Sequence, residues 1–208
     1  MSIWGHIYAA LYDRMLANTE RDGLAAHRAT LLTGAAGDVL EIGGGTGANL
    51  PFYGAAVRTL TIAEPEGPMA RRLQKRILAS RPDAALVRAR AEDLPFEDAS
   101  FDVAVATLVL CTVDDQARAL GELRRVLRPD GRLLFIEHVR SEEERLARVQ
   151  DRMAPINVRV GHGCRCNRRT LDGIAHAGFA ITRLERDTLS HTPAFLSPLV
   201  IGVAEPAS

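Results

Sequence analysis

The stretch from Val39 to Gly47 reads VLEIGGGTG, a short apolar run that ends on Glu41 and passes into four glycines within five positions. A second apolar run, Leu60 to Ala63, ends on another acid, Glu64. Glycine lets the backbone turn sharply and lets a ligand lie against it. A carboxylate after the next strand can accept hydrogen bonds from both hydroxyls of a ribose. This order predicts a nucleotide-type ligand site at the edge of a parallel sheet.

The charge beside the glycine turn distinguishes two classes of ligand. A dinucleotide site spaces its glycines as GxGxxG and offers the start of a helix to a diphosphate. Ala48 takes the place of the last glycine, a replacement that some dinucleotide sites tolerate. Glu41 would repel a diphosphate but attract the ammonium group of S-adenosylmethionine, which carries no phosphate. We therefore expect a methyl donor, with an NAD-linked oxidoreductase as the alternative.

Further segments resemble a known family. The run from Ala91 to Phe96, followed by Ser100 to Asp102, is similar to the AEDLPF…SFD segment of class I S-adenosylmethionine-dependent methyltransferases, in the small-molecule branch that includes ubiquinone and menaquinone C-methyltransferases. Other segments resemble the alkyl-thiol methyltransferases: Thr107–Cys111, Arg125–Gly131, Phe135–Val139, Gly163-Cys164 and Arg169-Thr170. The resemblance covers roughly residues 8 to 204 and implies S-adenosylmethionine as cofactor.

Apolar runs of about five residues alternate with stretches of helical spacing, which is typical of βα units. We expect a doubly wound α/β fold with a mostly parallel, seven-stranded sheet and helices on both faces, the Rossmann-like methyltransferase fold that the resemblance implies. The expected strands are 38–42, 58–63, 85–89, 102–106, 132–138, 179–185 and 199–204. The 208 residues suit a single methyltransferase domain.

Two regions fall outside this alternation. Residues 1–36 are expected to form one or two helices that act as a lid over the donor site. Residues 139–170 are polar, rich in arginine and expected to be irregular. Because ligands bind at the carboxyl ends of strands in an open parallel sheet, we expect residues 139–170 to form an insertion at the acceptor site.

The predicted donor site combines the glycine turn with the residues that follow the first four strands. Glycines should contact the methionine and ribose parts, Glu64 the ribose diol, Met69 the adenine face, and Thr107 the region of the transferable methyl group. The predicted donor-binding residues are Glu41, Gly43, Gly45, Gly47, Asn49, Glu64, Pro65, Met69, Ala91, Glu92 and Thr107.

The acceptor end has two candidate catalytic residues. His138 lies at the end of the fifth expected strand and could deprotonate a thiol or hydroxyl near neutral pH, or merely form a hydrogen bond there. Tyr12 shares a helical face with Tyr8. These rings could close over the sulfonium or pack in the core, and Tyr8 is a candidate substrate-binding residue.

One histidine and two cysteines occupy alternate positions late in the chain, at His162, Cys164 and Cys166. In an extended segment they could project to one side. Zinc usually takes four ligands, and no fourth lies at a familiar spacing, so we expect no bound metal. We expect His162 and Cys164 to line the acceptor pocket.

Composition narrows the class of function. Lysine plus arginine equals aspartate plus glutamate at 26 each, which argues against a nucleic-acid partner. The start lacks the features of a signal peptide, and no apolar run is long enough for an integral membrane segment. Three cysteines suit a reducing, cytoplasmic location.

The expected function is a methyltransferase for a small, fairly apolar acceptor, with a thiol as the first choice. Methylation of carbon or oxygen on a quinone-like or secondary-metabolite ring, or of a lipid amine, is an alternative. A sensor that binds S-adenosylmethionine without transferring its methyl group is an alternative of another class. The oligomeric state is left open.

Overall fold

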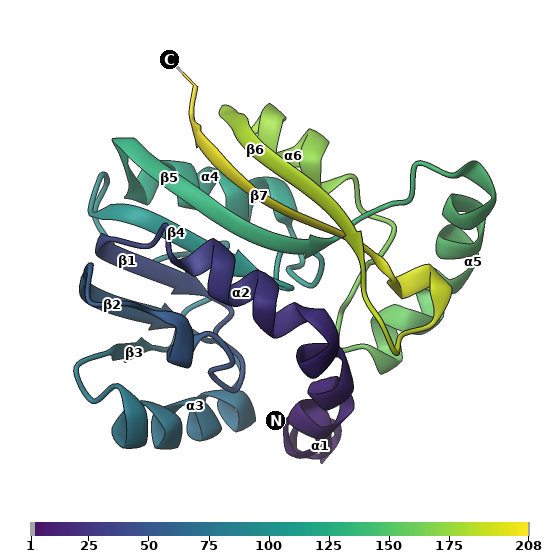
Figure 1. Cartoon of the computed structure of the whole chain (residues 1–208), viewed down its shortest axis with the longest axis horizontal. Coiled ribbons are helices and arrows are strands. Elements are labelled where there is room, and N and C mark those ends of the chain that lie inside the picture. Colours follow the sequence, from purple (N-terminus) through teal and green to yellow (C-terminus); the bar gives the residue numbers. More distant parts are fainter. Residues whose placement is uncertain (1–2, 208) are drawn as a thin grey trace.

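The computed structural model describes residues 3–207, without the side chains of residues 3, 4 and 8. Seven strands form one sheet in the order β3-β2-β1-β4-β5-β7-β6 (Figure 1). Neighbouring strands are parallel except at β7, which runs antiparallel to both β5 and β6. The strands are β1 (Gly37–Ile42), β2 (Val57–Ala63), β3 (Ala85–Val87), β4 (Phe101–Thr107), β5 (Leu127–His138), β6 (Phe179–Thr188) and β7 (Pro198–Pro206).

Helices cover both faces of this sheet. The helices of residues 3–207 are α1 (Ile3–Thr19), η1 (Glu20–Leu24), α2 (Ala25–Leu32), η2 (Leu50–Phe52), α3 (Gly67–Ser80), α4 (Gln116–Val126), α5 (Glu144–Val160), α6 (Thr170–His176) and η3 (Ala194–Leu196). Val39 packs in one core cluster with α2 and α3, and its neighbour Leu40 packs in another with α4 and α6. Successive strand residues point to opposite faces, so a buried β1 supplies both cores. The predicted fold class is therefore confirmed.

Several predicted strand boundaries differ from the structure, and β6 and β7 extend to Thr188 and Pro206 rather than to residues 185 and 204. β5 begins at Leu127 rather than at residue 132, because Leu127 pairs with Phe101 before a shift in register brings Arg132 opposite Val103. β3 ends at Val87 rather than at residue 89, because only three of its residues pair with β2.

The expectation that residues 139–170 are irregular is wrong, because α5 takes up 17 of them. Its buried positions include two polar residues, Gln150 and Asn157, beside Ala147 and Ala154. The Gln150 amide donates to the backbone oxygens of residues 139, 166 and 195, so tertiary contacts satisfy it. The sequence does not predict this helix, because its buried face includes polar residues and therefore lacks the apolar spacing typical of a helix, and because Pro155 lies inside it.

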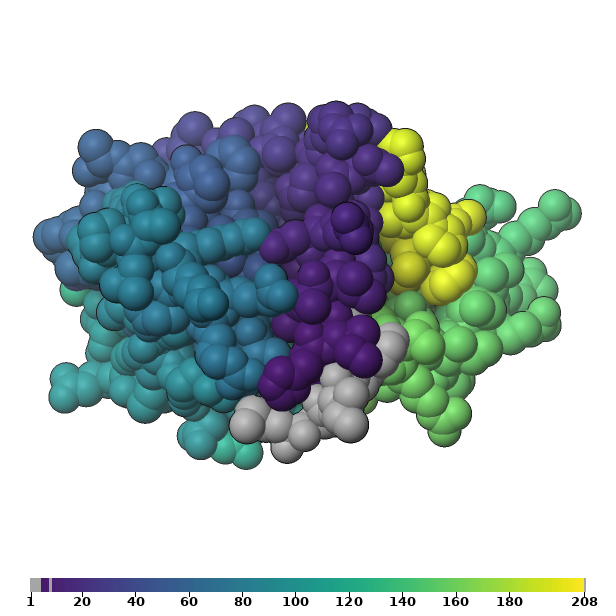
Figure 2. All heavy atoms as spheres, turned by 90° about the horizontal axis from the view of Figure 1, so that it is seen from below, coloured from purple at the N-terminus to yellow at the C-terminus, as the bar shows by residue number. Residues whose placement is uncertain are grey.

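The N-terminal helices run along one side of the molecule. In Figure 2 the purple N-terminal residues cross the face between the teal residues of the first half and the green residues of the α5 region. The Asp13 carboxylate of α1 accepts a hydrogen bond from Thr46 Oγ1 at 2.6 Å and pairs with Arg76 at 2.5 Å. These contacts hold α1 against the glycine turn and α3. Within residues 3–207, no helix combines the length and apolar character needed to cross a bilayer.

Candidate donor and acceptor site

A cleft of about 730 Å³ opens at the carboxyl ends of the central strands. It lies beside the point where the strand order reverses, because the chain moves from β1 outward to β2 and β3 and then returns to β4. Open α/β sheets bind their ligands at such a point. The predicted site residues that line this cleft are Tyr12, Gly43, Gly45, Glu64, Pro65, Met69, Ala91, Glu92 and His162.

The glycine turn forms the floor of the cleft. Gly43 has a φ of +59°, and a Cβ atom there would lie 2.2 Å from Val109 Cγ2. Gly45 has a φ of +56°, but a Cβ atom there would meet nothing closer than the Gly43 oxygen at 3.9 Å. Packing within the protein therefore requires glycine at position 43. At position 45 the backbone conformation favours glycine, and the space beside it is left for a ligand.

Glu64 closes one side of the turn and is only 4% exposed. Its Oε2 accepts from the Gly45 amide at 2.8 Å, and its Oε1 accepts from the Glu66 amide at 2.7 Å. Burial raises the pKa of Glu64 to about 7, and the two amide hydrogen bonds oppose that rise. Each carboxylate oxygen has two lone pairs, so each keeps one for a ligand hydroxyl. This geometry suits a ribose diol.

Four predicted donor residues, Glu41, Gly47, Asn49 and Thr107, do not line the cleft. A Cβ atom at Gly47, whose φ is +92°, would lie 2.8 Å from Leu50 Cδ1, so packing within the protein requires glycine there. Glu41 is buried beneath the turn and accepts from Asn49 Nδ2 at 3.0 Å and Tyr53 Oη at 2.8 Å. The second hydrogen of the Asn49 amide group goes to Thr107 Oγ1 at 2.9 Å. Burial raises the pKa of Glu41. Glu41, Asn49 and Thr107 therefore form a buried network that supports the turn.

Arg28 completes this network, and no local pattern in the sequence points to it. It is 3% exposed and donates from one nitrogen to Asn49 Oδ1 at 2.8 Å and to Thr107 Oγ1 at 3.1 Å. Its charge is paired with Glu20 at 3.0 Å. An arginine in a short helix usually lies in solvent, so only the position of α2 against the sheet reveals it.

Glu92 lies on the side expected to bind adenine, but most of its carboxylate contacts are internal. Oε1 accepts from the amides of Asp114 and Asp115 at 2.8 and 3.3 Å, and Arg90 lies 3.3 Å away. Glu92 thereby fixes the loop after β4. That loop includes Leu108, which lines the cleft with a φ of +56°. A leucine in this conformation is strained, which is common at ligand sites.

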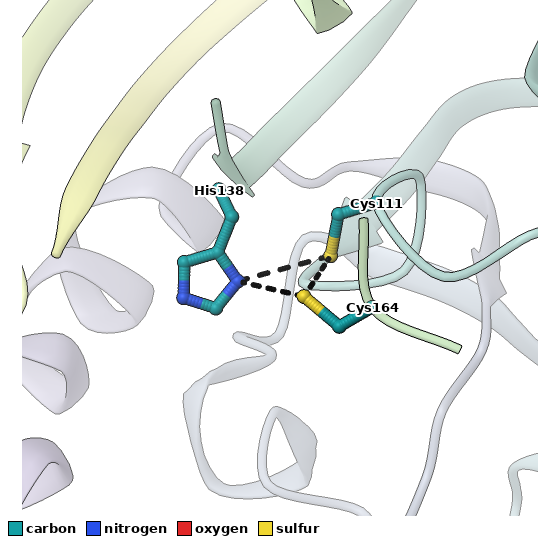
Figure 3. A group of neighbouring side chains, drawn as sticks. All are labelled: Cys111, His138 and Cys164. Carbon is teal, nitrogen blue, oxygen red and sulfur yellow. Dashed lines mark hydrogen bonds between the residues drawn. The ribbon is translucent and has the colours of Figure 1, made fainter. Parts of the chain in front are cut away.

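Beyond the end of β5, two thiols and an imidazole converge (Figure 3). His138 Nδ1 lies 3.8 Å from Cys111 Sγ and 3.8 Å from Cys164 Sγ, and the two sulfur atoms are 3.8 Å apart. The hydrogen bond between the thiols lowers the pKa of Cys164 to about 5, with a further contribution from His138, and raises that of Cys111. Among the described residues, the buried Nε2 of His138 has no hydrogen-bond partner.

The remaining predicted acceptor residues do not lie together. His162 lines the cleft with Nε2 3.8 Å from Glu66 Oε1, whereas Cys164 is buried against Cys111. The three alternating side chains therefore do not form one group. Tyr12 lines the cleft, and the side chain of Tyr8 lies outside the described residues. The sequence analysis assigned no role to Cys111 or Glu137, although Glu137 lies at the end of the predicted strand 132–138 and Cys111 belongs to the loop after the predicted strand 102–106.

Comparisons with known proteins agree with this geometry. Residues 40–135 match the family model described as a methyltransferase domain. Thiol S-methyltransferase TMT1B from Homo sapiens is 39% identical over 161 residues, 74% of this chain and 66% of the relative. Thiol S-methyltransferase TMT1A from Homo sapiens is 29% identical over 201 residues, 95% of this chain and 82% of the relative. The match spans 62–66% of the human, rat and mouse TMT1B sequences, less than two thirds of their length.

Solved structures share the fold. A Bacillus halodurans protein described as a methyltransferase superposes with a TM-score of 0.74 at 15% identity, over 87% of this chain and 99% of its own. Geranyl diphosphate C-methyltransferase from Streptomyces coelicolor, in a complex that includes S-adenosyl-L-homocysteine, superposes with a TM-score of 0.66 at 16% identity, over 88% and 76%. With its glycine turn and seven-stranded sheet, the chain belongs to the class I S-adenosylmethionine-dependent methyltransferases.

Proposed function

We propose that this protein transfers the methyl group of S-adenosylmethionine to a small, apolar thiol. The observation that carries the choice of sulfur is the likeness to TMT1A, a thiol S-methyltransferase, across 95% of this chain. The geometry at Glu64 and Gly45 supports the donor, because a carboxylate and an open glycine turn face one cleft.

Four apolar side chains in the lining of the cleft support an apolar acceptor. Leu108, Val109 and Val113 line the cleft from the loop after β4, and Val158 lines it from α5. The volume of about 730 Å³ lies in the upper part of the range of about 300–1,000 Å³ for small-molecule sites. Methyl transfer from a sulfonium needs a collinear nucleophile and the exclusion of water, and an apolar wall serves both needs.

The test pairs acceptors that differ in one atom. The protein is incubated with methyl-labelled donor and with thiophenol or phenol, and with an alkyl thiol or the matching alcohol. We expect transfer to both thiols at rates at least tenfold above their oxygen analogues. A quinol and a lipid amine are included, because preferential transfer to either would assign the alternative acceptor class.

A binding measurement separates an enzyme from a sensor. Calorimetry with S-adenosylmethionine should show one donor site per chain, together with turnover on a thiol. Donor binding without transfer to any member of the panel would contradict the proposal and favour a sensor.

A further inference from the structure

The cluster of Cys111, His138 and Cys164 has the dimensions of a metal site. Its three potential ligand atoms are separated pairwise by 3.8 Å. A point equidistant from three such atoms lies about 2.2 Å from each, and zinc binds sulfur at about 2.3 Å and imidazole nitrogen at about 2.0–2.1 Å. A cation could therefore bind with little movement of the side chains.

The backbone that carries these ligands is held in place by buried polar residues. The Glu137 carboxylate accepts from the amides of Val109, Leu110 and Cys111 at 3.0, 2.8 and 3.1 Å. Asn157 of α5 donates to the carbonyl oxygen of Cys164 at 2.8 Å. The loop after β4 and the segment after α5 are thereby fixed against the end of β5, which carries His138. Such outer contacts orient ligands in metal sites.

The charges around the cluster also suit a divalent cation. Two thiolates neutralise an ion of charge +2. The Arg168 cation lies within electrostatic reach of Glu137 and of both thiols. Because the two thiolates balance the charge of the ion, its binding would leave the cluster itself close to neutral, which limits the cost of burying charge.

We propose that Cys111, His138 and Cys164 form a binding site for a thiophilic divalent cation, and that Zn²⁺ is its ion. Thiolate and imidazole are the preferred ligands of Zn²⁺, whereas Mg²⁺ and Ca²⁺ prefer oxygen. This is a different group of residues from the alternating His162, Cys164 and Cys166 that the sequence suggested. The inference goes beyond the proposed acceptor and does not depend on it.

Three protein ligands leave a fourth position, as in catalytic rather than structural zinc sites. Cys166 is fully buried and belongs to the same cysteine cluster, but it is not one of the three groups that converge. Thr112 and Gly163, the chain neighbours of Cys111 and Cys164, line the cleft. The site therefore lies directly behind the cleft wall, at the acceptor end.

An ion on Nδ1 changes the role expected for His138. The imidazole would hold its proton on Nε2, and it could not then accept a proton from the acceptor. The metal-ligand role and the general-base role are therefore mutually exclusive.

The test measures the ion and does not rely on turnover. The full chain, purified under reducing conditions, is analysed for metal content and titrated with Zn²⁺ against a chromophoric chelator. We expect one Zn²⁺ per chain. Co²⁺ in its place should give tetrahedral d–d bands and thiolate-to-metal charge-transfer absorption from two sulfur ligands.

The variants Cys111→Ala, Cys164→Ala and His138→Ala should each weaken Zn²⁺ binding by at least about 100-fold, because losing even an outer-shell partner costs about 10–100-fold. Cys166→Ala is the matched control, since it removes an equally buried thiol and should keep the ion. A rise in melting temperature with S-adenosylhomocysteine shows that each variant is folded.

Three results would overturn the site. One is wild-type protein that binds no Zn²⁺ and gives no cobalt–thiolate absorption. Another is equal loss of the ion in Cys166→Ala and Cys111→Ala. The third is wild-type protein that is purified without a metal ion and forms a disulfide between Cys111 and Cys164 on mild oxidation. That result would assign the cluster to redox chemistry.

Discussion

Replacing Glu64 by glutamine should reduce donor affinity strongly while leaving the fold intact. The wild-type carboxylate accepts from two backbone amides and has one lone pair per oxygen left for a ribose diol. Glutamine keeps one acceptor oxygen and places an NH₂ group against a backbone N–H. Hydrogen bonds to charged groups contribute about 1.5–3 kcal/mol each. Loss of one of them corresponds to a fall in affinity of roughly 10- to 150-fold, and loss of both to a fall of at least about 150-fold.

The pH dependence gives a second readout with a defined sign. Burial raises the pKa of Glu64 from 4.5 to about 7. The diol hydroxyls donate to the carboxylate, so the proton must leave for the donor to bind well. At pH 5.5 wild-type affinity should be lower than at pH 8 by up to about 30-fold. The same raised pKa acts oppositely on the free protein, whose stability from this group is highest at low pH and declines as pH rises from 4.5 through 7.

Calorimetry with S-adenosylhomocysteine at pH 5.5 and 8, with denaturant unfolding of the free proteins, measures both effects. Glu64→Gln should bind weakly at both pH values, with little dependence on pH. Its unfolding free energy at pH 8 should change by less than about 2 kcal/mol, because removal of a buried charge offsets a lost hydrogen bond. Unchanged affinity, or a large loss of stability with no selective loss of binding, would refute the assignment of Glu64 to the ribose.

Three further changes test the site. Gly45→Ala should weaken donor binding at least tenfold and lower the free energy of unfolding by about 1–2 kcal/mol, because the φ of +56° strains alanine. Calorimetry measures the first effect and chemical unfolding the second. An unchanged donor affinity would show that no ligand occupies the space beside Gly45. Arg28→Met should lower the free energy of unfolding, measured by chemical denaturation, by about 3 kcal/mol, since Glu20, Asn49 and Thr107 lose a shared donor. A loss below about 1 kcal/mol would contradict the buried network. Tyr12→Leu should weaken binding of the sulfonium donor by about 0.5–2 kcal/mol more than binding of the uncharged product, because an aromatic face attracts a cation. Tyr12→Phe keeps the aromatic face and should show no such difference. Equal weakening of both ligands in Tyr12→Leu would make Tyr12 a packing residue.

The sequence by itself determined the sheet and its donor edge. Glu41, the glycines and Glu64 lie within one βαβ stretch, where strand, turn and helix signals are local. The positive φ of such a turn favours glycine for local reasons, so Gly43 and Gly45 could be identified without coordinates. Strand β5 could also be predicted from a local apolar run. Its first residues could not, because pairing with β4, and not local propensity, sets where the strand begins.

Only the tertiary structure decided the acceptor side. Cys111 and Cys164 are separated by 53 positions, and Arg28 lies 79 positions from Thr107. The buried face of α5 includes Gln150, whose polarity gives no apolar period to detect. Such groups meet because parallel strands and their loops end at one edge of the sheet, however far apart they are along the chain. Local patterns carry no information about which loops meet there, since that depends on packing across the whole domain.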